Sequence, residues 1–227
     1  VAEEVYDMQM IANRDQIKIE PWDYRFYSEK VRKEKYNLNS DELKQYLQLD
    51  NLTNAMHYVA GRLFFYEFSP IPSGIVSVFD EDVKVWEVKD KRTGKHIGLW
   101  YLDPFARSGK RSGAWATTYR SYSSFDGEKN VLASNNSNFV KPAPGEPLLV
   151  SWDDATTFFH EFGHALHFFA SNVRYPSLNN GVRDYTEFQS QLMERWLSSD
   201  EVIKRFLVHY KTGEPVPNDL VEKIKKT

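Results

Sequence analysis

Two histidines four residues apart, with a glutamate directly after the first, stand out in TTFFHEFGHALHFF, residues 156–169. Residues four apart in an α-helix lie on one face, about 6 Å apart along the axis, so His160 and His164 can converge on one ion. Glu161 lies beside them, where its side chain can reach a water molecule on that ion rather than the ion itself. This is the H-E-x-x-H arrangement of two zinc ligands and a general base. The pattern predicts a zinc site with Glu161 as the catalytic residue.

A catalytic zinc ion usually takes three protein ligands and keeps one position for water. His167 is seven residues beyond His160, about 10 Å along a straight helix, which is too far for zinc–nitrogen bonds of about 2.0–2.1 Å. We expect His167 to contact substrate or to pack in the core. Glu187 is the better third ligand, because a second helix antiparallel to the first can bring it to the ion. Glu194 or Asp184 would then orient a ligand imidazole.

The alternative is a metal-free pair of structural helices, which predicts no zinc at all. Its weakness is the composition of the first helix, where the motif lies among phenylalanines and other apolar residues. Burying two histidines and a glutamate there costs free energy unless they have partners, and a metal ion supplies partners. Asp153 or Asp154 can cap this helix.

Composition narrows the possible ligands and partners. The 227 residues include no cysteine, so any metal must be held by histidine, aspartate or glutamate. The net charge of -3 gives no basic surplus for nucleic acid. No apolar run approaches the roughly 20 residues that a membrane span needs. We expect no nucleic acid as a partner and no membrane-spanning segment.

Hydrophobic periodicity and turn residues divide the chain into three parts. Residues 1–70 are predicted to be helical, 80–140 to form a small sheet, and 150–227 to hold the helices of the zinc site. The predicted helices cover 22–35, 40–49, 51–68, 153–170, 185–198 and 200–211, with a last short one after 215. The predicted strands cover 83–88, 97–102, 114–122 and 131–140. The expected fold class is therefore α+β, predominantly α-helical.

FFHEFGHALH followed by RDYTEFQSQLMERW resembles the thimet oligopeptidase family of zinc metallopeptidases. The peptidyl-dipeptidase (dipeptidyl carboxypeptidase) branch is the most similar. The resemblance extends over WDYRFYSEKVRKEKYNL, VWEVKD, DPFARSGKRSGAW, FVKPAPGEPLLVSWDDATTFFHEFGHALH and HYKTGEPVPNDL. These segments together are far more specific than the zinc motif alone.

The resemblance implies a zincin-like catalytic core with a small β-sheet beside the H-E-x-x-H helix. It implies one zinc ion per chain, held by His160, His164 and Glu187, with Glu161 as the general base. An edge strand near Gly113 and Ala114 would pair with an extended peptide. A turn that enters a buried strand explains the same glycine equally well.

The implied substrates are short peptides, from which this branch releases C-terminal dipeptides. Capture of the free carboxylate needs a cation, for which the candidates are Arg107, Lys110, Arg111 and Arg120. An oligoendopeptidase that cleaves internally is the first alternative. A zinc- and peptide-binding fragment with little activity of its own is the second.

Some features depart from the family pattern. Gln189 stands where relatives usually have proline, and the loop 177–182 is about two residues shorter. The chain also ends before the tyrosine- and histidine-bearing segment that stabilises the tetrahedral intermediate in the family. We therefore expect a central catalytic fragment of a longer enzyme, with the remainder missing at both ends. A cytoplasmic location is favoured, and a periplasmic or exported one is the alternative.

Overall fold

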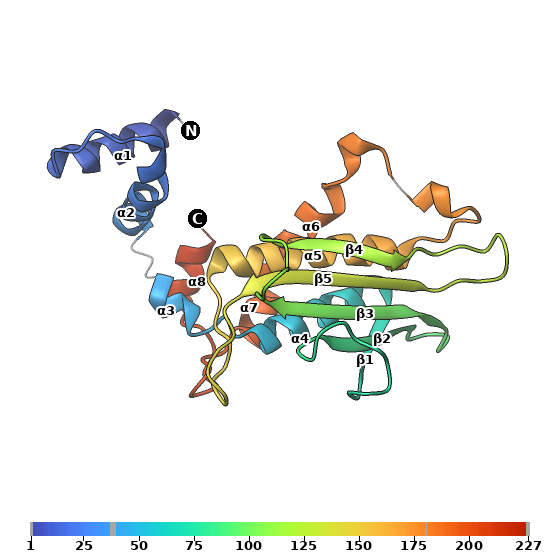
Figure 1. Cartoon of the computed structure of the whole chain (residues 1–227). Coiled ribbons are helices and arrows are strands. Elements are labelled where there is room, and N and C mark those ends of the chain that lie inside the picture. The colour runs from blue at the N-terminus through green and yellow to red at the C-terminus, as the bar shows by residue number, and fades with distance from the viewer. Residues whose placement is uncertain (1, 37–39, 180, 226–227) are drawn as a thin grey trace.

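The computed structural model describes residues 2–36, 40–179 and 181–225. Position 180 of the loop noted above, and positions 37–39 of the first helical part, lie outside the described residues. The architecture is α+β, as expected: a five-stranded mixed sheet carries helices against one face (Figure 1). None of the described helices is both long enough and apolar enough to cross a membrane.

The sheet has the strand order β1-β2-β3-β5-β4. Only the central pair, β3 and β5, is parallel, and the other neighbours are antiparallel. The predicted hairpin and the two later strands are confirmed, and β4 lies at an edge of the sheet. The strands are β1 (Tyr66–Ile71), β2 (Lys84–Asp90), β3 (His96–Phe105), β4 (Trp115–Arg120) and β5 (Val131–Phe139).

The helices form two groups, one small and one built around the sheet. The first pair packs through its own cluster, which includes Met8, Ile11 and Tyr27, and stands beside the main body in Figure 1. The helices are α1 (Ala2–Arg14), α2 (Tyr24–Tyr36), α3 (Ser40–Lys44), α4 (Leu49–Phe64), α5 (Trp152–Ala170), α6 (Phe188–Leu197), α7 (Asp200–Phe206) and α8 (Asn218–Ile224). Short 3-10 turns cover Pro21–Asp23, Pro176–Asn179 and Arg183–Tyr185.

The main core joins the sheet to α4 and α5. Trp100 of β3 is fully buried and meets Phe162 of α5 edge to face, with ring centroids 5.2 Å apart. The Trp100 Nε1–H donates to Asn135 Oδ1 of β5 at 2.6 Å, which satisfies its polar atom inside the core. This packing holds α5 against β3 and β5, and the turn of α5 next to Phe162 therefore lies beside β4.

The prediction of helix up to residue 68 is wrong. Helix α4 ends at Phe64, Phe65 takes a left-handed conformation with φ 59°, and the chain continues as strand β1. The segment 66–71 pairs with β2 at the edge of the sheet, where Pro70 is tolerated because an edge strand has an unpaired side. Long-range pairing with β2 decides this boundary, which helical spacing of apolar residues alone extends too far.

Three other helices are also shorter than predicted. Helix α3 ends at Lys44 rather than 49, and Gln48 forms an isolated bridge with Leu149 beyond the turn that follows. Helix α6 begins at Phe188 rather than 185, because Arg183–Tyr185 forms a 3-10 turn and Glu187 is the N-cap. Helix α7 ends at Phe206 rather than 211, and the His209 N–H bonds instead to Glu214 O in the following turn.

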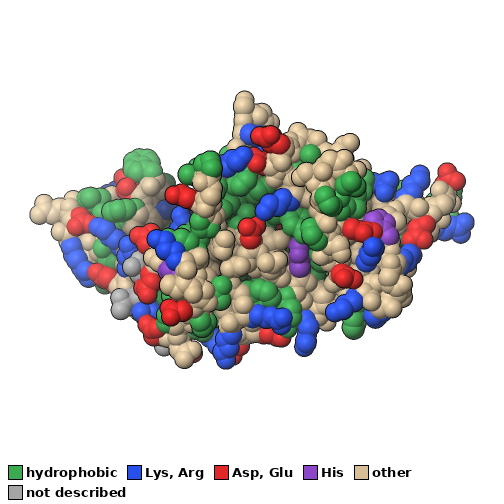
Figure 2. Space-filling view, turned by 90° about the horizontal axis from the view of Figure 1, so that it is seen from below, with side chains coloured by type: hydrophobic (Ala, Val, Ile, Leu, Met, Phe, Trp, Pro, Cys, Tyr) green, Lys and Arg blue, Asp and Glu red, His purple; other side chains and the backbone are tan. Residues whose placement is uncertain are grey.

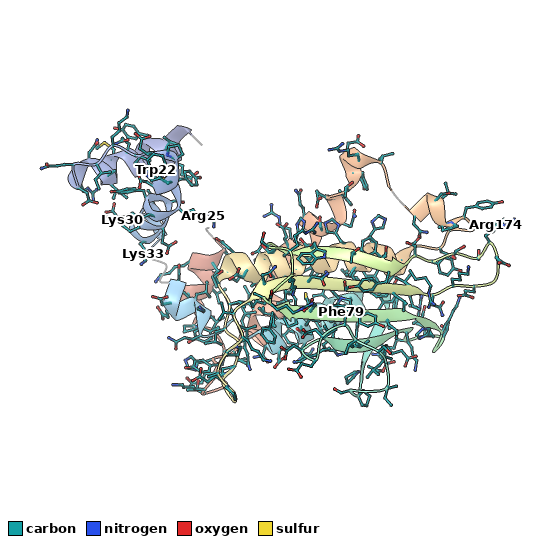
Figure 3. The ribbon with its side chains drawn as sticks, viewed as in Figure 1. Trp22, Arg25, Lys30, Lys33, Phe79 and Arg174 are labelled. Carbon is teal, nitrogen blue, oxygen red and sulfur yellow. The ribbon has the colours of Figure 1, made fainter. Side chains whose placement is uncertain are left out.

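Charged side chains of both signs are interspersed on the face shown in Figure 2, with no single basic field. The basic side chains Arg25, Lys30 and Lys33 labelled in Figure 3 all come from α2, with the exposed Trp22 nearby. Lys30 is paired with Asp15 at 2.8 Å. None of these four residues lines the pocket of the site described next, although Lys33 lies near the start of α5.

Candidate metal centre

Helix α5 carries the histidine motif, and its start is fixed by a reciprocal cap. Ser151 Oγ accepts a hydrogen bond from the Asp154 N–H at 3.1 Å, and Asp154 Oδ2 accepts from the Ser151 N–H at 3.3 Å. This capping box satisfies two backbone donors that the first turn leaves open. Asp154 is thus part of the cap, as expected, while Ser151 is the N-cap residue itself.

Gly163 lets α5 and α6 approach closely. A Cβ at this position would lie 2.7 Å from Ser190 Cα and 2.9 Å from Gln189 O, so no larger residue fits without a shift of the helices. The glycine lies between the two motif histidines, and its neighbours lie just after Glu187. The close contact therefore brings the start of α6 over the histidines of α5.

Three side chains meet at this crossing. His160 Nε2 lies 3.0 Å from Glu187 Oε2, and His164 Nε2 lies 3.1 Å from the same oxygen. One possible ligand atom from each residue falls within 4.8 Å of the others. Among the described residues this is the single group of three with such spacing. The side chains are 24%, 16% and 51% exposed for His160, His164 and Glu187, which leaves the carboxylate side open to a ligand.

A carboxylate orients the ring of His160. Its Nδ1 lies 2.6 Å from Glu194 Oε1, so the Nδ1–H donates to that oxygen and the Nε2 lone pair faces Glu187. Burial lowers the pKa of His164, which favours the neutral ring that can bind a metal. Of the two candidates for an orienting carboxylate, the structure places Glu194 here. Asp184 lies exposed in the Arg183–Tyr185 turn and has no hydrogen bond or ion pair to either histidine among the described residues.

Ser190 forms a hydrogen bond to the carboxylate of Glu187. Its hydroxyl donates to Glu187 Oε2 at 2.8 Å and to the Glu187 main-chain oxygen at 3.0 Å. The Ser190 hydrogen bond is the main cause of a lowered pKa at Glu187, with the nearby histidines adding to it. The lowered pKa keeps Glu187 ionised, the form that binds metal. Sequence reasoning missed Ser190, although its position three residues after Glu187 is a usable helical signal.

Glu161 lies between α5 and the edge strand. Burial raises the pKa of its carboxyl group, while His160 and a hydrogen bond from the Ala116 N–H of β4 act in the opposite direction. Ala116 belongs to the strand that follows Gly113 and Ala114, and Gly113 takes a left-handed φ of 85° at the turn into it. The backbone donor on β4 was not foreseen from the sequence, because it depends on how the strand lies against α5.

A pocket of about 680 Å³ surrounds these groups. It is lined by Ala114, Trp115, Ala116, His160, Glu161, His164, His167, Phe168, Asn179, Gly181, Tyr185, Thr186, Glu187, Phe188 and Gln189. No lysine or arginine is among these lining residues. His167 lines the pocket but is outside the group of three converging atoms, and its Nδ1 lies 2.8 Å from Gln189 Nε2.

Two of the cations considered for binding a substrate carboxylate form ion pairs with Asp103 of the same chain. Lys110 and Asp103 form an ion pair at 3.0 Å with side chains only 3% and 2% exposed. Lys110 Nζ also donates to the main-chain oxygens of Asp103 and Phe105, and burial lowers its pKa. Arg107 binds both oxygens of Asp103, at 2.7 and 3.0 Å. These contacts tie the loop before β4 to the end of β3.

The other two cations also lie outside the pocket lining. The Arg111 guanidinium lies 4.7 Å from the ring centroid of Trp115, and Arg120 Nε donates to Asn130 O at 2.7 Å. Arg111 is the nearer to the pocket, because Trp115 is one of its lining residues.

The chain is similar to known peptidases over nearly its whole length. The profile of Peptidase family M3 matches residues 1–227. The chain is 37% identical over 229 residues to a dipeptidyl carboxypeptidase of Escherichia coli (strain K12), covering 99% of this chain and 33% of that protein. It is 40% identical to the Salmonella typhimurium dipeptidyl carboxypeptidase over 214 residues, covering 92% of this chain and 30% of that one. Oligopeptidase A of Escherichia coli is 33% identical, with 91% and 31% covered.

The chain spans about a third of the length of these curated relatives. The match nevertheless runs over the whole chain, including the sheet and the two helices α5 and α6. With the profile and the identities in agreement, the chain belongs to Peptidase family M3.

Proposed function

We propose that this chain carries the zinc site of a metallopeptidase that hydrolyses short peptides. The observation that supports it most strongly is the position of Glu187 Oε2, 3.0 and 3.1 Å from the two imidazole nitrogens. Membership of Peptidase family M3 supports the reaction class.

The donor set fits zinc. Imidazole and carboxylate are common zinc ligands, and tetrahedral bonds of about 2.0–2.1 Å place neighbouring ligand atoms about 3.3 Å apart. The separations of 3.0 and 3.1 Å are close to that value. His160, His164 and Glu187 would hold one ion, and Glu194 would keep His160 in the correct tautomer. A bound zinc ion supplies Lewis-acid polarisation of a carbonyl group and of a water molecule.

Glu161 acts in this proposal as the general base. Its carboxylate takes a proton from water and delivers it to the amide nitrogen that leaves. Burial raises the pKa of Glu161 toward the working pH, which makes the carboxylate a better proton acceptor. The Ala116 N–H holds the carboxylate at the edge of the pocket, where it is positioned between strand and helix.

The edge strand β4 would hold the peptide. Among the described residues no strand pairs with its side away from β5, and Ala114, Trp115 and Ala116 line the pocket. An extended peptide can add to such an edge through main-chain hydrogen bonds. Gly113 and Ala114 are then substrate-binding residues.

Release of C-terminal dipeptides is the favoured mode of cleavage, because dipeptidyl carboxypeptidases are among the relatives. Oligopeptidase A is also among them, so internal cleavage is the second candidate. Products from one defined octapeptide separate the two, because only the first mode releases dipeptides stepwise from the C-terminus. Bound zinc with negligible hydrolysis would instead favour a peptide-binding fragment.

Metal content tests the core of the proposal. Elemental analysis of the purified chain is expected to give about one zinc ion per chain, lost in His160→Ala and in Glu187→Ala. Matched controls are His96→Ala on β3 and Glu42→Ala on α3, which should retain the metal because neither is in the group of three. Absence of zinc in the parent chain, or its retention in both site variants, would refute the proposed site.

A further inference from the structure

A second hydrogen-bonded pair lies in the metal pocket, and neither member belongs to the group of three converging ligand atoms. Gln189 Nε2 lies 2.8 Å from His167 Nδ1 and 2.8 Å from the main-chain oxygen of Thr186. His167 follows His164 by one turn on α5, and Gln189 lies in the first turn of α6. The pair therefore spans the same two helices as the metal centre, one turn further along α5.

The geometry determines which way the Gln189 amide faces. A main-chain oxygen can only accept hydrogen bonds, so the atom 2.8 Å from Thr186 O must be the amide nitrogen. The same nitrogen faces His167 Nδ1, and its second N–H donates there. His167 Nδ1 is thus an acceptor without a proton. In the neutral ring the proton must then be on Nε2.

The Nε2–H of His167 has no hydrogen-bond partner among the residues that the structure describes. The ring is exposed, and its Cε1 edge faces the loop at Gly181, where an added Cβ would lie 4.0 Å away. Gly181 also lines the pocket. The Nε2–H of His167 is therefore a hydrogen-bond donor exposed to solvent at the wall of the pocket.

The residues that line the pocket indicate which kind of acceptor the His167 Nε2–H would bind. The lining holds two carboxylates, Glu161 and Glu187, and no lysine or arginine. A neutral N–H beside these acids suits an uncharged acceptor better than a further carboxylate. A peptide in extended conformation offers such acceptors as main-chain carbonyl oxygens.

We propose that Gln189 fixes His167 as the Nε2–H tautomer and that this N–H donates to a main-chain carbonyl oxygen of the bound peptide. His167 is then a substrate-contacting residue, and Gln189 is a positioning residue that acts through it. The proposal rests on the peptide-binding function proposed above, but the tautomer itself does not.

Nitrogen-15 NMR of the histidine rings in the zinc-free chain tests the first half, because ring nitrogens with and without a proton differ in chemical shift. The parent is expected to show His167 as the Nε2–H tautomer, and Gln189→Leu is expected to show a mixture of tautomers. Gln191→Leu is the matched control, since it makes the same change two residues further on α6. An Nδ1–H ring in the parent, or no change in Gln189→Leu, would overturn the assignment.

Peptide affinity tests the second half, measured on zinc-loaded Glu161→Gln protein with a peptide blocked at both ends. His167→Phe and Gln189→Leu are each expected to weaken binding about fivefold, the scale of one neutral hydrogen bond. The double variant should be no weaker than either single one, because both remove the same contact. Additive losses, unchanged affinity, or no binding by the otherwise unaltered protein would refute the peptide contact. The zinc content of the same samples reports separately on the metal centre.

Discussion

Gly163→Ala tests whether the close approach of two helices builds the metal centre. The added Cβ would lie 2.7 Å from Ser190 Cα and 3.0 Å from Met193 Cβ. Carbon atoms in contact are about 3.5–4.0 Å apart, so α6 must move away from α5 by about 1 Å. Both contacts are with backbone or Cβ atoms, which cannot swing aside as the end of a long side chain can.

This displacement of α6 should weaken zinc binding, because Glu187 lies at the start of the helix that moves. Metal–ligand distances tolerate only about ±0.2 Å, so we expect zinc affinity to fall by about 10–100-fold, the range seen when groups around a metal site are disturbed. Overpacking should also destabilise the fold by about 1–3 kcal/mol, offset by up to about 1 kcal/mol of helix propensity.

Competition with a chelator of known zinc affinity measures the first effect, and urea unfolding of the zinc-free chain measures the second. Gly61→Ala is the matched control, because Gly61 also lies in a helix and its added Cβ would meet only Tyr66 O, at 3.1 Å. Zinc affinity equal to that of the parent in Gly163→Ala would refute the argument that this helix crossing sets the ligand geometry.

Three further outcomes follow from individual side chains. Glu194→Gln should weaken zinc binding about tenfold by chelator competition, because His160 loses its charged partner; unchanged affinity would contradict that role. Lys110→Met should lower the free energy of unfolding by about 3 kcal/mol in urea, since it removes a cation from the buried Asp103 carboxylate, and a loss below 1 kcal/mol would count against the ion pair. Burial lowers the pKa of His57 to about 3, so the unfolded chain, with a pKa near 6.5, binds more protons as the pH falls. The zinc-free chain should therefore lose about 2 kcal/mol of stability from this group between pH 8 and pH 5, and His57→Phe should abolish that part of the loss.

Three glutamates at the site have environments that suit three different tasks. Glu187 is stabilised in its ionised form by Ser190, Glu161 has its pKa raised by burial, and Glu194 is hydrogen-bonded to His160. In the proposed mechanism the three carboxylates would serve metal binding, proton transfer and the orientation of His160, each in a different environment. The lowered pKa of Glu187 and the raised pKa of Glu161 are the electrostatic signs of that division.

The buried ion pairs of Asp103 connect the sheet to the proposed peptide-binding edge. Lys110 and Arg107 hold the loop that precedes β4, and Asn138 Nδ2 donates to Gly113 O at 2.7 Å at the end of that loop. The position of the β4 edge thus depends on contacts at the end of β3 and on β5. Lys110 and Arg107, both candidates in the sequence for binding a substrate carboxylate, are part of this support instead.

Sequence spacing alone predicts the parts of the candidate site that lie on one element. The spacing of His160, Glu161 and His164 places them on neighbouring positions of one helix, because an α-helix has a fixed rise and turn per residue. The same rule predicted that His167 cannot join the ligands, and the structure leaves it outside the group of three. The sequence also favours Glu187 as the third ligand, because a second helix that packs antiparallel to the first can bring it to the ion.

Tertiary packing sets the contacts between segments that are far apart in the chain. It selected Glu194 over Asp184 as the partner of His160, brought Ala116 to Glu161, and ended α4 before the edge strand β1. Local periodicity cannot make these choices, since each depends on the packing of one element against another. The spacing within a helix is set by its backbone hydrogen bonds, whereas the distance between two helices is set by whichever side chains, or a glycine, lie between them.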